Sequence, residues 1–385
     1  MTSFAMVVQV ASKADLLVLT EKLCKAEETF VRVAACESAQ TVGEAMTEEE
    51  IASSFTPMLR RLIAESWWTA KVSAAALMAT AYPKCTAEVK AELRASLMQI
   101  TKDEAPMVRR AVARALGKLC AVFDAADVVP NLLPSLNKLA NDDQDSVRIL
   151  AFGSCLEMCS TQPADQCTDF IYPAIETFAK DASWRVRLEV ARALTQVVES
   201  VVHAGPMPVS IVALMLKDPE LDVRRFALEH SNSVVQKFPE LAESSGIVRA
   251  ICLLADVDPE VPNALPMKVL LAAQGVKMAT LLGQEVARTY IIPMMVKLTQ
   301  EESVEVRIAV LENWAELVTV AGGPAVLEAF PLSALCSDSS WRVRKSFLEG
   351  LPTLAATVPR SGATPPTHTH TFARTRVLAR MRTHT

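Results

Sequence analysis

The sequence predicts an all-α fold, a solenoid (α-α superhelix) of about nine two-helix repeats. The first observation is a recurring unit in which an acidic residue is followed six residues later by a cation and then by a helical run, as in DASWRVRLEVARAL from Asp181 to Leu194. The second is the regular spacing of 37 to 44 residues between successive cations. The third is composition, because 51% of the residues are hydrophobic but only 5% are aromatic. The core must therefore consist of Ala, Leu and Val, which suit closely packed helices.

Nine cations, most of them preceded by valine, mark the units: Arg32, Lys71, Arg109, Arg148, Arg187, Arg224, Lys268, Arg307 and Arg344. A period of about 40 residues without glycine-rich or strand-like segments is typical of HEAT or armadillo repeats. Each such repeat buries its apolar face only against its neighbours, so the repeats form one array rather than separate globules. We expect one HEAT-repeat solenoid over residues 1–358, with an incomplete first repeat.

Two positions recur within the regular units. A proline lies 14 residues before the cation in four of them: Pro57, Pro134, Pro173 and Pro293. Such a proline removes a backbone donor and should bend the first helix. An acid lies six residues before the cation in seven of them: Glu65, Asp103, Asp142, Asp181, Asp218, Glu301 and Asp338. It falls in the turn before the second helix, where a carboxylate can accept turn amides and complement the helix dipole, and the cation should reach the acid of a neighbouring unit.

The unit of Lys268 departs from this pattern. It has the longest spacing, 44 residues, and Pro259, Pro262 and Pro266 crowd ahead of its cation. Counting back from the cation, Pro262 takes the position of the acid. We expect a disturbed turn or a bend there.

The last residues, 359–385, are rich in Pro, Thr and His and have no amphipathic period, so we expect a disordered tail. The net charge of the chain is −5, but the tail contains five arginines and no acid, which leaves the body at −10. A negatively charged body is electrostatically unsuited to binding nucleic acid, which is itself negatively charged. A basic or mixed protein partner is the better expectation.

The nine cysteines are odd in number and scattered: Cys24, Cys36, Cys85, Cys120, Cys155, Cys159, Cys167, Cys252 and Cys336. This pattern favours reduced thiols in a cytoplasmic or nuclear protein. The N-terminus lacks the basic start of a secretory signal. No uninterrupted apolar stretch reaches the roughly 18 residues of a membrane span. We therefore expect a soluble intracellular protein without a membrane partner.

Nothing in the sequence predicts an enzyme. The body contains two histidines, His203 and His230, and neither belongs to an arrangement typical of a nucleophile site. There is no phosphate-binding glycine loop and no His-Glu dipeptide of the kind that binds iron in some helical repeats. Cys155, Cys159 and Cys167 could suggest a metal site, but buried core thiols are the better interpretation. We expect no catalysis, no metal and no cofactor.

Four of the five tryptophans fall in the turn just before the cation: Trp67, Trp68, Trp184 and Trp341. They can pack over the adjacent repeat, or they can stand along one edge of the solenoid as interface anchors beside arginines. Both interpretations can hold together, since a tryptophan can bury one edge of its ring and offer the other. Trp314 lies inside a helical run and is predicted to belong to the core.

The chain resembles the scaffold (A, structural) subunits of type 2A protein phosphatase, a HEAT-repeat family. The matching segments are ESWWTAKVSAAALMATAYPKCTAEVKAELR, DEAPMVRRAVARALGKL, DDQDSVRILA, DASWRVRLEVARAL, EVRIAVLENW and DSSWRVRKSFLEGLPTLA. They follow the family's order and spacing, including the longer gap before Lys268, and cover nearly the whole body. The resemblance implies a non-catalytic scaffold for protein phosphatase 2A.

In that family the turns within repeats hold a regulatory (B-type) subunit on the N-terminal two-thirds and the catalytic subunit on the last few repeats. Carried over, the regulatory-subunit edge comprises Trp67, Trp68, Glu104, Pro106, Arg109, Arg110, Asp143, Trp184 and Arg185. The catalytic-subunit site retains Trp341 and Arg342. Because the family carries more repeats, most of its surface for the catalytic subunit would lie beyond Pro359.

An alternative is a karyopherin-like or other HEAT-repeat adaptor that binds protein cargo. Such carriers usually bind on their concave helices rather than on the turns. The phosphatase interpretation depends on the turn residues, chiefly Trp184 and Arg185.

Overall fold

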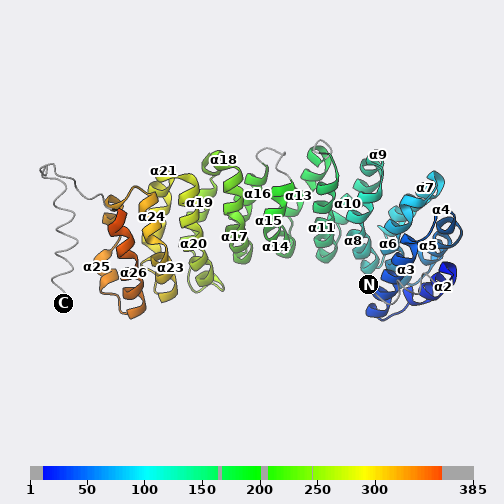
Figure 1. The fold of residues 1–385 in the computed structure, drawn as a ribbon, viewed down its shortest axis with the longest axis horizontal. Helices are drawn as coiled ribbons and strands as arrows, with labels where there is room; N and C mark the ends of the chain where they lie inside the picture. Colours follow the sequence, from blue (N-terminus) through cyan, green and yellow to red (C-terminus); the bar gives the residue numbers. More distant parts are fainter. Residues whose placement is uncertain (1–11, 164–166, 201–206, 245, 358–385) are drawn as a thin grey trace, which may run out of the picture. The chain divides into compact units, whose positions relative to one another are not determined.

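The computed structural model of the protein describes residues 12–163, 167–200, 207–244 and 246–357, and every regular element in these ranges is helical (Figure 1). The chain divides into two compact units, Met1–Ile211 and Val212–Thr385. The predicted tail and His203 lie outside the described residues.

The cations mark the second helix of each repeat, as predicted. In the first unit these helices are α3 (Thr29–Glu44), α6 (Trp68–Ala81), α8 (Pro106–Val122), α11 (Asp145–Thr161) and α14 (Trp184–Arg192), which continues as α15 (Leu194–Ser200). In the second unit they are α17 (Leu221–Lys237), α20 (Ala264–Leu282), α23 (Val304–Glu312) with its continuation α24 (Trp314–Val320), and α26 (Trp341–Thr357). The cation lies three residues after the first residue of each helix, except in α20, where Lys268 lies four residues after it.

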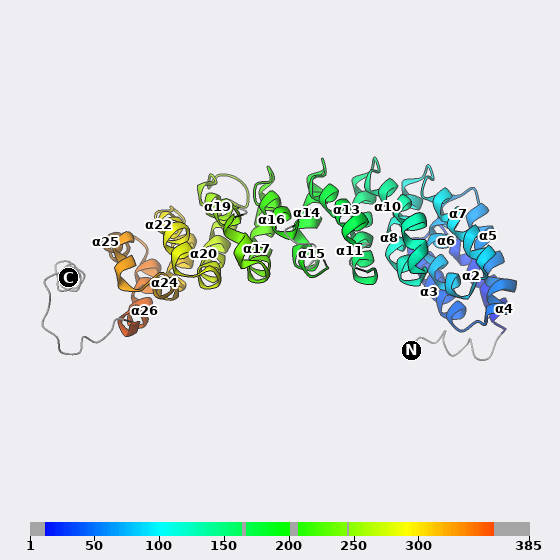
Figure 2. The same ribbon diagram turned by 90° about the horizontal axis from the view of Figure 1, so that it is seen from above.

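The first helices form a second layer, which Figure 2 shows beside the layer of second helices within each unit. In the first unit they are α2 (Lys13–Cys24), α5 (Thr56–Ala64), α7 (Ala87–Ile100), α10 (Leu133–Ala140) and α13 (Tyr172–Ala179). α16 (Met207–Met215) contains the boundary between the units, and the second unit has α18 (Pro239–Ser244), α19 (Ile247–Cys252), α22 (Ile292–Leu298) and α25 (Leu332–Cys336). Short helices and 3₁₀ turns complete the connections: α4 (Glu48–Glu50), Tyr82–Lys84, α9 (Ala125–Asp127), Leu253–Asp256, α21 (Gln284–Val286) and Pro324–Ala329.

The four recurring prolines share one local structure. Each is the second residue of a first helix, and a five-residue π-helical segment precedes that helix: Ile51–Phe55, Val128–Leu132, Cys167–Ile171 and Ala287–Ile291. A proline ring clashes with the carbonyl four residues before it, and the wider π turn relieves that clash. A π segment before each of these prolines therefore accommodates the ring that was predicted to bend the helix.

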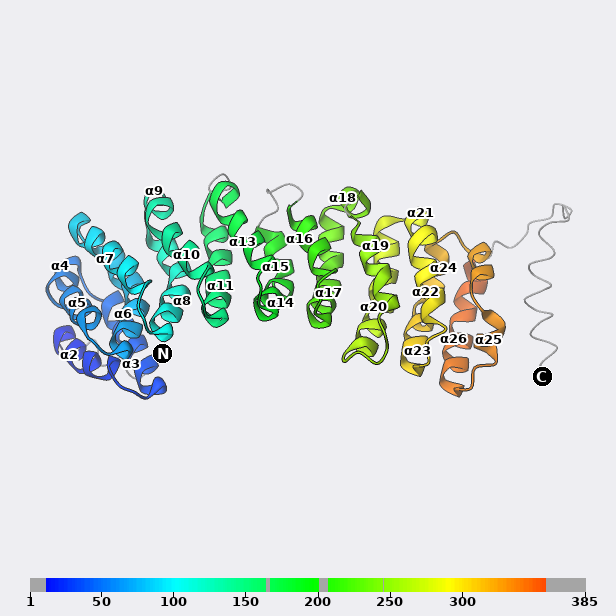
Figure 3. The same cartoon turned by 180° about the vertical axis from the view of Figure 1, so that it is seen from behind.

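Small side chains let the second helices approach closely, and α3, α6, α8 and α11 of the first unit pack in succession (Figure 3). Ala70, Ala74 and Ala75 of α6 are buried. Between α6 and α2, the Ser73 hydroxyl donates to the carbonyl of Cys24 at 2.7 Å. Trp314 is fully buried, as predicted. The core therefore has the Ala, Leu and Val character that composition indicated.

By length and composition alone, α20 could cross a membrane, in contrast to the prediction from the sequence. Half of its apolar window is buried, and the helix packs against α17, α23 and α24. Its Lys268 side chain is buried in an ion pair with Glu301. These contacts are those of a core helix.

The cation of one repeat binds the acid of the next, as predicted. In the first unit the contacts are Lys71 Nζ to Asp103 Oδ2 at 2.7 Å, Arg109 Nε to Asp142 Oδ2 at 2.6 Å, and Arg148 Nε to Asp181 Oδ2 at 2.7 Å. In the second unit they are Lys268 Nζ to Glu301 Oε1 and Arg307 Nε to Asp338 Oδ2, both at 2.8 Å. We call each such pair a rung.

Each arginine rung also fixes the turns at its two ends. The Nη1 atom of Arg148 donates to the carbonyl of Asp142 in its own turn at 2.7 Å, while Nη2 donates to Asp181 Oδ1 at 2.8 Å. The same Asp181 oxygen accepts the amide of Ser183 at 2.7 Å. The hydrogen bond to Asp181 raises the pKa of the Arg148 guanidinium. One guanidinium thus holds two neighbouring turns in register.

The first cation does not form a rung. Glu65 pairs with Lys25 instead, at 2.6 Å. The Nη1 atom of Arg32 donates to the carbonyls of Ala26 and Glu27, and its guanidinium lies over the ring of Trp68, 5.2 Å from the ring centroid. Here an aromatic ring takes the place of the carboxylate.

Breaking a rung should destabilise the stack more than breaking a surface pair. Asp181→Asn leaves the Arg148 charge without its counter-ion where the side chains of Arg148 and Asp181 are only 14% and 8% exposed. We expect the free energy of unfolding to fall by about 2–3 kcal/mol. The control, Glu92→Gln, breaks a pair with Arg60 whose side chains are 43% and 47% exposed, and should cost less than about 1 kcal/mol. Urea unfolding followed by circular dichroism measures both, and equal losses would contradict the structural role of the rung.

Candidate partner-binding edge

The intra-repeat turns of the first unit are the candidate site. We define the turn edge as residues 65–68, 103–107, 142–145 and 181–185, which follow one another along the rungs. Each turn ends where a second helix begins, so its side chains lie at helix N-termini. The rungs set the register of these turns, and the turns present the predicted binding residues.

The first turn presents a tryptophan pair. Trp67 precedes α6 and is 56% exposed, whereas Trp68, the first residue of α6, is half-buried over Arg32. The two ring centroids are 6.5 Å apart and the ring planes are inclined by 40°. Both interpretations of the turn tryptophans therefore hold at this turn, because Trp68 packs against the preceding repeat and Trp67 is offered to solvent.

The second turn contains a structural arginine. The Arg109 guanidinium binds Asp142, Asp143 and the carbonyls of Asp103 and Glu104. The hydrogen bond to Asp142 raises the pKa of Arg109. With all its donors directed at its own chain, Arg109 holds the edge together rather than offering itself to a partner.

The residues around Arg109 remain accessible. Glu104 and Pro106 are exposed and Arg110 is half-buried. Asp143 is exposed on the next turn, where its Oδ1 accepts from Arg109 at 2.6 Å. The sequence interpretation omitted Met107, an exposed apolar side chain whose Sδ lies 4.0 Å from Arg110 Nη1. Its position directly after Pro106 in the PMVRR run was the available signal.

The last turn of the first unit presents a tryptophan beside an arginine. Trp184 is the first residue of α14 and is 41% exposed. The Arg185 guanidinium lies 5.8 Å from the centroid of the Trp184 ring, and its Nη1 atom lies 3.5 Å from Asp145 Oδ2 on the preceding turn. This aromatic–guanidinium pair is held only weakly, so it can engage another surface. Asp145 was not predicted and orients Arg185.

The corresponding turn of the second unit contains the other two predicted residues. Trp341 begins α26 and is 64% exposed. Arg342 Nη1 lies 3.8 Å from Glu305 Oε1. Beneath them is the rung of Arg307 and Asp338. Although burial opposes ionisation of Asp338, the hydrogen bond from Arg307 lowers the pKa of this carboxyl.

The rungs of the second unit are interrupted at Arg224. Its buried Nε has no hydrogen-bond partner among the described residues. Although Pro262 takes the counted position of the acid, Asp258 caps this turn: its Oδ1 accepts the amide of Glu260 at 2.9 Å, as the aspartates of the regular turns accept an amide two residues on. The turn is longer than the regular ones, with Asn263 at a positive φ of 66°, and Asp258 is exposed. The disturbed turn predicted for this unit is therefore present, and Pro262 occupies the counted position because the inserted residues follow the acid.

Arg224 should therefore contribute little to stability. Arg224→Met removes an unsatisfied buried donor while it keeps the packing of the stem, so the free energy of unfolding should stay within about 1 kcal/mol of the wild-type value or rise. In the same unit, Arg307→Met should lower it by about 2–3 kcal/mol because Asp338 loses its partner. Urea unfolding of the two variants compares them directly. A loss for Arg224→Met as large as that for Arg307→Met would show that Arg224 has a partner in solution.

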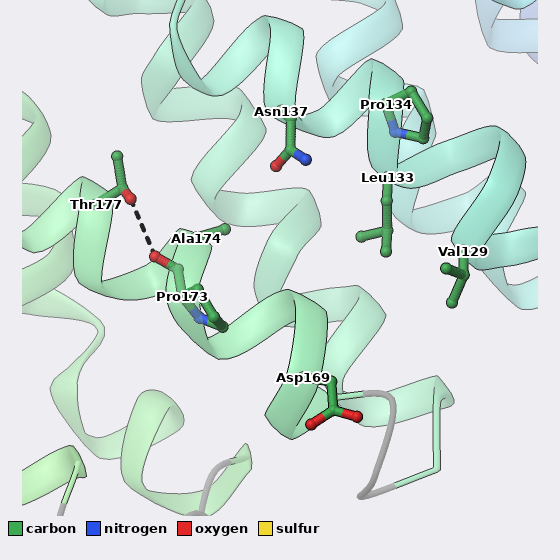
Figure 4. Close-up of a pocket in the computed structure, with 8 residues that line it drawn as sticks. All are labelled: Val129, Leu133, Pro134, Asn137, Asp169, Pro173, Ala174 and Thr177. Carbon is green, nitrogen blue, oxygen red and sulfur yellow. Dashed lines mark hydrogen bonds between the residues drawn. The ribbon is translucent and has the colours of Figure 1, made fainter.

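A groove of about 430 Å³ lies between α10 and α13 of the first unit (Figure 4). It is lined by Val129, Leu133, Pro134, Asn137, Asp169, Pro173, Ala174 and Thr177. The Thr177 hydroxyl donates to the carbonyl of Pro173 at 3.0 Å. The groove is open and has one charged residue, Asp169, so it lacks the convergent polar groups of a catalytic pocket.

The three neighbouring cysteines are buried thiols, as predicted. Cys155, Cys159 and Cys167 are all buried, and Cys167 Sγ donates to the carbonyl of Cys159 at 3.6 Å. In the part of the chain that the structure describes, no group of three or more His, Cys, Asp or Glu residues could hold a metal ion.

Comparison with known proteins supplies a family. The family model described as "PIK3R4-like, middle domain" matches residues 16–240, more than half of the chain. Among solved structures, Kap121p superimposes with a TM-score of 0.65 at 14% identity, covering 90% of this chain and 37% of its own. Importin beta gives a TM-score of 0.62 at 15% identity, covering 97% of this chain and 50% of its own. At this identity the structures show the solenoid fold alone.

The curated relatives are phosphatase subunits. The A-type regulatory subunit of protein phosphatase PP2A from Schizosaccharomyces pombe is 34% identical over 173 residues, 44% of this chain and 29% of that protein. The probable PP2A regulatory subunit of Caenorhabditis elegans is 38% identical over 148 residues, 37% of this chain and 25% of that protein. The alpha isoform of the 65 kDa A-type regulatory subunit of protein phosphatase 2A from Arabidopsis thaliana is 41% identical over 113 residues, 29% of this chain and 19% of that protein.

These matches span less than a third of each relative's length. The names describe regulatory subunits, and none describes a catalytic one. The chain belongs to the PIK3R4-like middle-domain family of helical repeats, and its sequence relatives are the A-type regulatory subunits of protein phosphatase PP2A.

Proposed function

We propose that this chain is a non-catalytic scaffold that holds the regulatory (B-type) subunit of protein phosphatase 2A on the turn edge of its first unit. The observation that carries the proposal is the pair of exposed tryptophans, Trp67 and Trp184, on turns that the rungs keep in register. The relatives, named as A-type regulatory subunits of PP2A, support it.

The edge suits a protein partner chemically. Tryptophan and arginine are the residues that most often dominate binding energy at interfaces, because they bury large areas and keep a polar group for hydrogen bonding. The guanidinium of Arg185 lies beside the ring of Trp184. Met107 is an exposed apolar side chain on a turn that lies between those of Trp67 and Trp184. A scaffold of this kind works by position, since it raises the effective concentration of one bound protein near another.

The catalytic subunit would bind in the second unit, at Trp341 and Arg342. Both side chains are exposed, and Arg342 makes a long contact to Glu305. We propose this site on the same chemical grounds as the turn edge. The compartment that we propose is the cytoplasm or nucleus, since all nine cysteines are free thiols.

The alternative, a karyopherin-like cargo carrier, has only the shared solenoid fold in its favour. The solved carriers are 14–15% identical to the chain, and fold does not by itself imply function. The exposed aromatic residues of the turn edge favour the scaffold.

Trp184→Ala should weaken capture of a purified regulatory subunit by about 30-fold, and Arg185→Ala by about tenfold, as expected for residues that anchor an interface. Val18→Ala is the matched control, because Val18 is also an exposed apolar residue but lies in the middle of a first helix, away from the turns. Surface plasmon resonance measures the affinities, and far-ultraviolet circular dichroism checks that the helical content is unchanged.

Unchanged affinity in both variants would exclude the turn edge. The choice between functions rests on a second measurement, affinity purification of the full chain followed by mass spectrometry. Recovery of phosphatase subunits supports the scaffold, whereas recovery of transport factors with nuclear-signal cargo and no phosphatase subunits supports the carrier. Catalytic-subunit capture that is unchanged by Trp341→Ala would exclude the proposed site in the second unit.

A further inference from the structure

Two cysteines of the first repeat form a thiol pair that the scaffold role does not use. Cys24 is the last residue of α2, and Cys36 lies in the second turn of α3. Their Sγ atoms are 4.0 Å apart. Cys24 is fully buried, and Cys36 retains 8% of its surface. The pair lies between two helices that a short turn joins, and a disulfide requires the two sulfur atoms to approach from 4.0 Å to about 2 Å.

The surroundings of the pair favour a thiolate on Cys36. The hydrogen bond from the Cys24 thiol lowers the pKa of Cys36 to about 7, and Ser73 and the Arg32 guanidinium add to the effect, although burial and Glu37 oppose it. The same hydrogen bond raises the pKa of Cys24. Arg32 lies one helical turn before Cys36, on the same face of α3. One sulfur is thus activated and the other is kept protonated beside it.

Two other cysteines, the half-buried Cys252 and the buried Cys120, have the opposite environment. Desolvation raises the pKa of Cys252 to about 12. Burial also raises the pKa of Cys120, despite hydrogen bonds from Thr161 and Gln162. Such thiols are inert, because the thiolate is the nucleophile. An activated thiol next to a second cysteine is the arrangement that peroxide-sensing sites use.

We propose that Cys24 and Cys36 are a modification site at which hydrogen peroxide forms an intramolecular disulfide. In the first step the Cys36 thiolate attacks one oxygen of the peroxide, the O–O bond breaks, and Cys36 sulfenic acid and hydroxide result. In the second step the Cys24 sulfur attacks the sulfenic sulfur, and its proton passes to the hydroxide to give the first water. The sulfenic oxygen leaves as hydroxide and takes up the proton that Cys36 released to solvent when it ionised, which gives the second water. Two thiols and one peroxide thus give one disulfide and two waters.

The disulfide would close the turn between α2 and α3. That turn contains the carbonyls of Ala26 and Glu27 that hold Arg32, and Arg32 lies over Trp68 of the turn edge. The disulfide would therefore form next to residues 65–68, the first turn of the turn edge. The chemistry itself does not depend on which partner the edge binds.

The test treats the reduced full-length chain with hydrogen peroxide, stops the reaction with catalase and maps the disulfides by mass spectrometry of unreduced tryptic peptides. The expected product joins residues 23–25 to residues 33–60, and it should form at least about tenfold faster than Cys252 is oxidised. Dimedone added to the Cys24→Ser variant should label Cys36, because the sulfenic acid then has no partner. Ser73→Ala should slow the reaction.

Three results would overturn the proposal: no peptide that joins Cys24 to Cys36, oxidation of Cys36 no faster than that of Cys252, or no dimedone label on Cys36 in the Cys24→Ser variant. The peptide map of the wild-type chain decides the first two even if a variant fails to fold. Reduction by dithiothreitol should restore both thiols, since a disulfide is the only product proposed.

Discussion

The stack depends on a partly buried ion pair that recurs from repeat to repeat. A buried charge without its counter-ion destabilises a fold more than an uncharged side chain at the same place does. Because Arg148 lies partly buried between two turns, its charge requires the carboxylate of Asp181. Arg148 binds Asp181 through two hydrogen bonds. Its Nη1 atom also donates to the carbonyl of Asp142 in its own turn, and Asp181 also accepts the amide of Ser183. A hydrophobic contact could hold two helices together at several registers. The rung allows one register, and that register determines where the turn residues stand.

The gap at Arg224 separates the two contributions to stacking. α17 and α20 still pack against each other, although no rung joins their turns among the described residues. Apolar packing is therefore sufficient to hold neighbouring repeats together. The turn before α20 is joined to α17 by another contact, in which Asn263 Nδ2 donates to Asp222 Oδ1 at 3.0 Å. The rung fixes the turn, whereas apolar packing fixes the helices.

Much of this fold could be predicted, because its signals are periodic in the sequence. The cations mark the second helices, the acids cap the turns, and Trp314 is core. What could not be predicted depends on local geometry. Counting back from Lys268 predicted a disturbed turn at Pro262 but did not identify Asp258 as its acid, because the sequence does not show on which side of the acid the insertion lies. The π segments before Pro57 and its equivalents follow from a clash between the ring and a carbonyl, which sequence patterns do not reveal. Cys24 and Cys36 are 12 residues apart on two helices, so their contact emerges only from the packing.

The turn edge shows why residues next to each other in sequence must be tested separately. Arg109 and Arg110 were both predicted to bind a partner, but Arg109 has every donor directed at its own chain. An Arg109→Ala variant would lose partner binding even if Arg109 never touched the partner, because the turn that carries Glu104 and Pro106 would lose its connection to Asp142. Trp184 and Arg185 have no such role in the rung of Arg148 and Asp181. Weaker capture on their substitution can therefore be attributed to contact with the partner, provided that the helical content is unchanged.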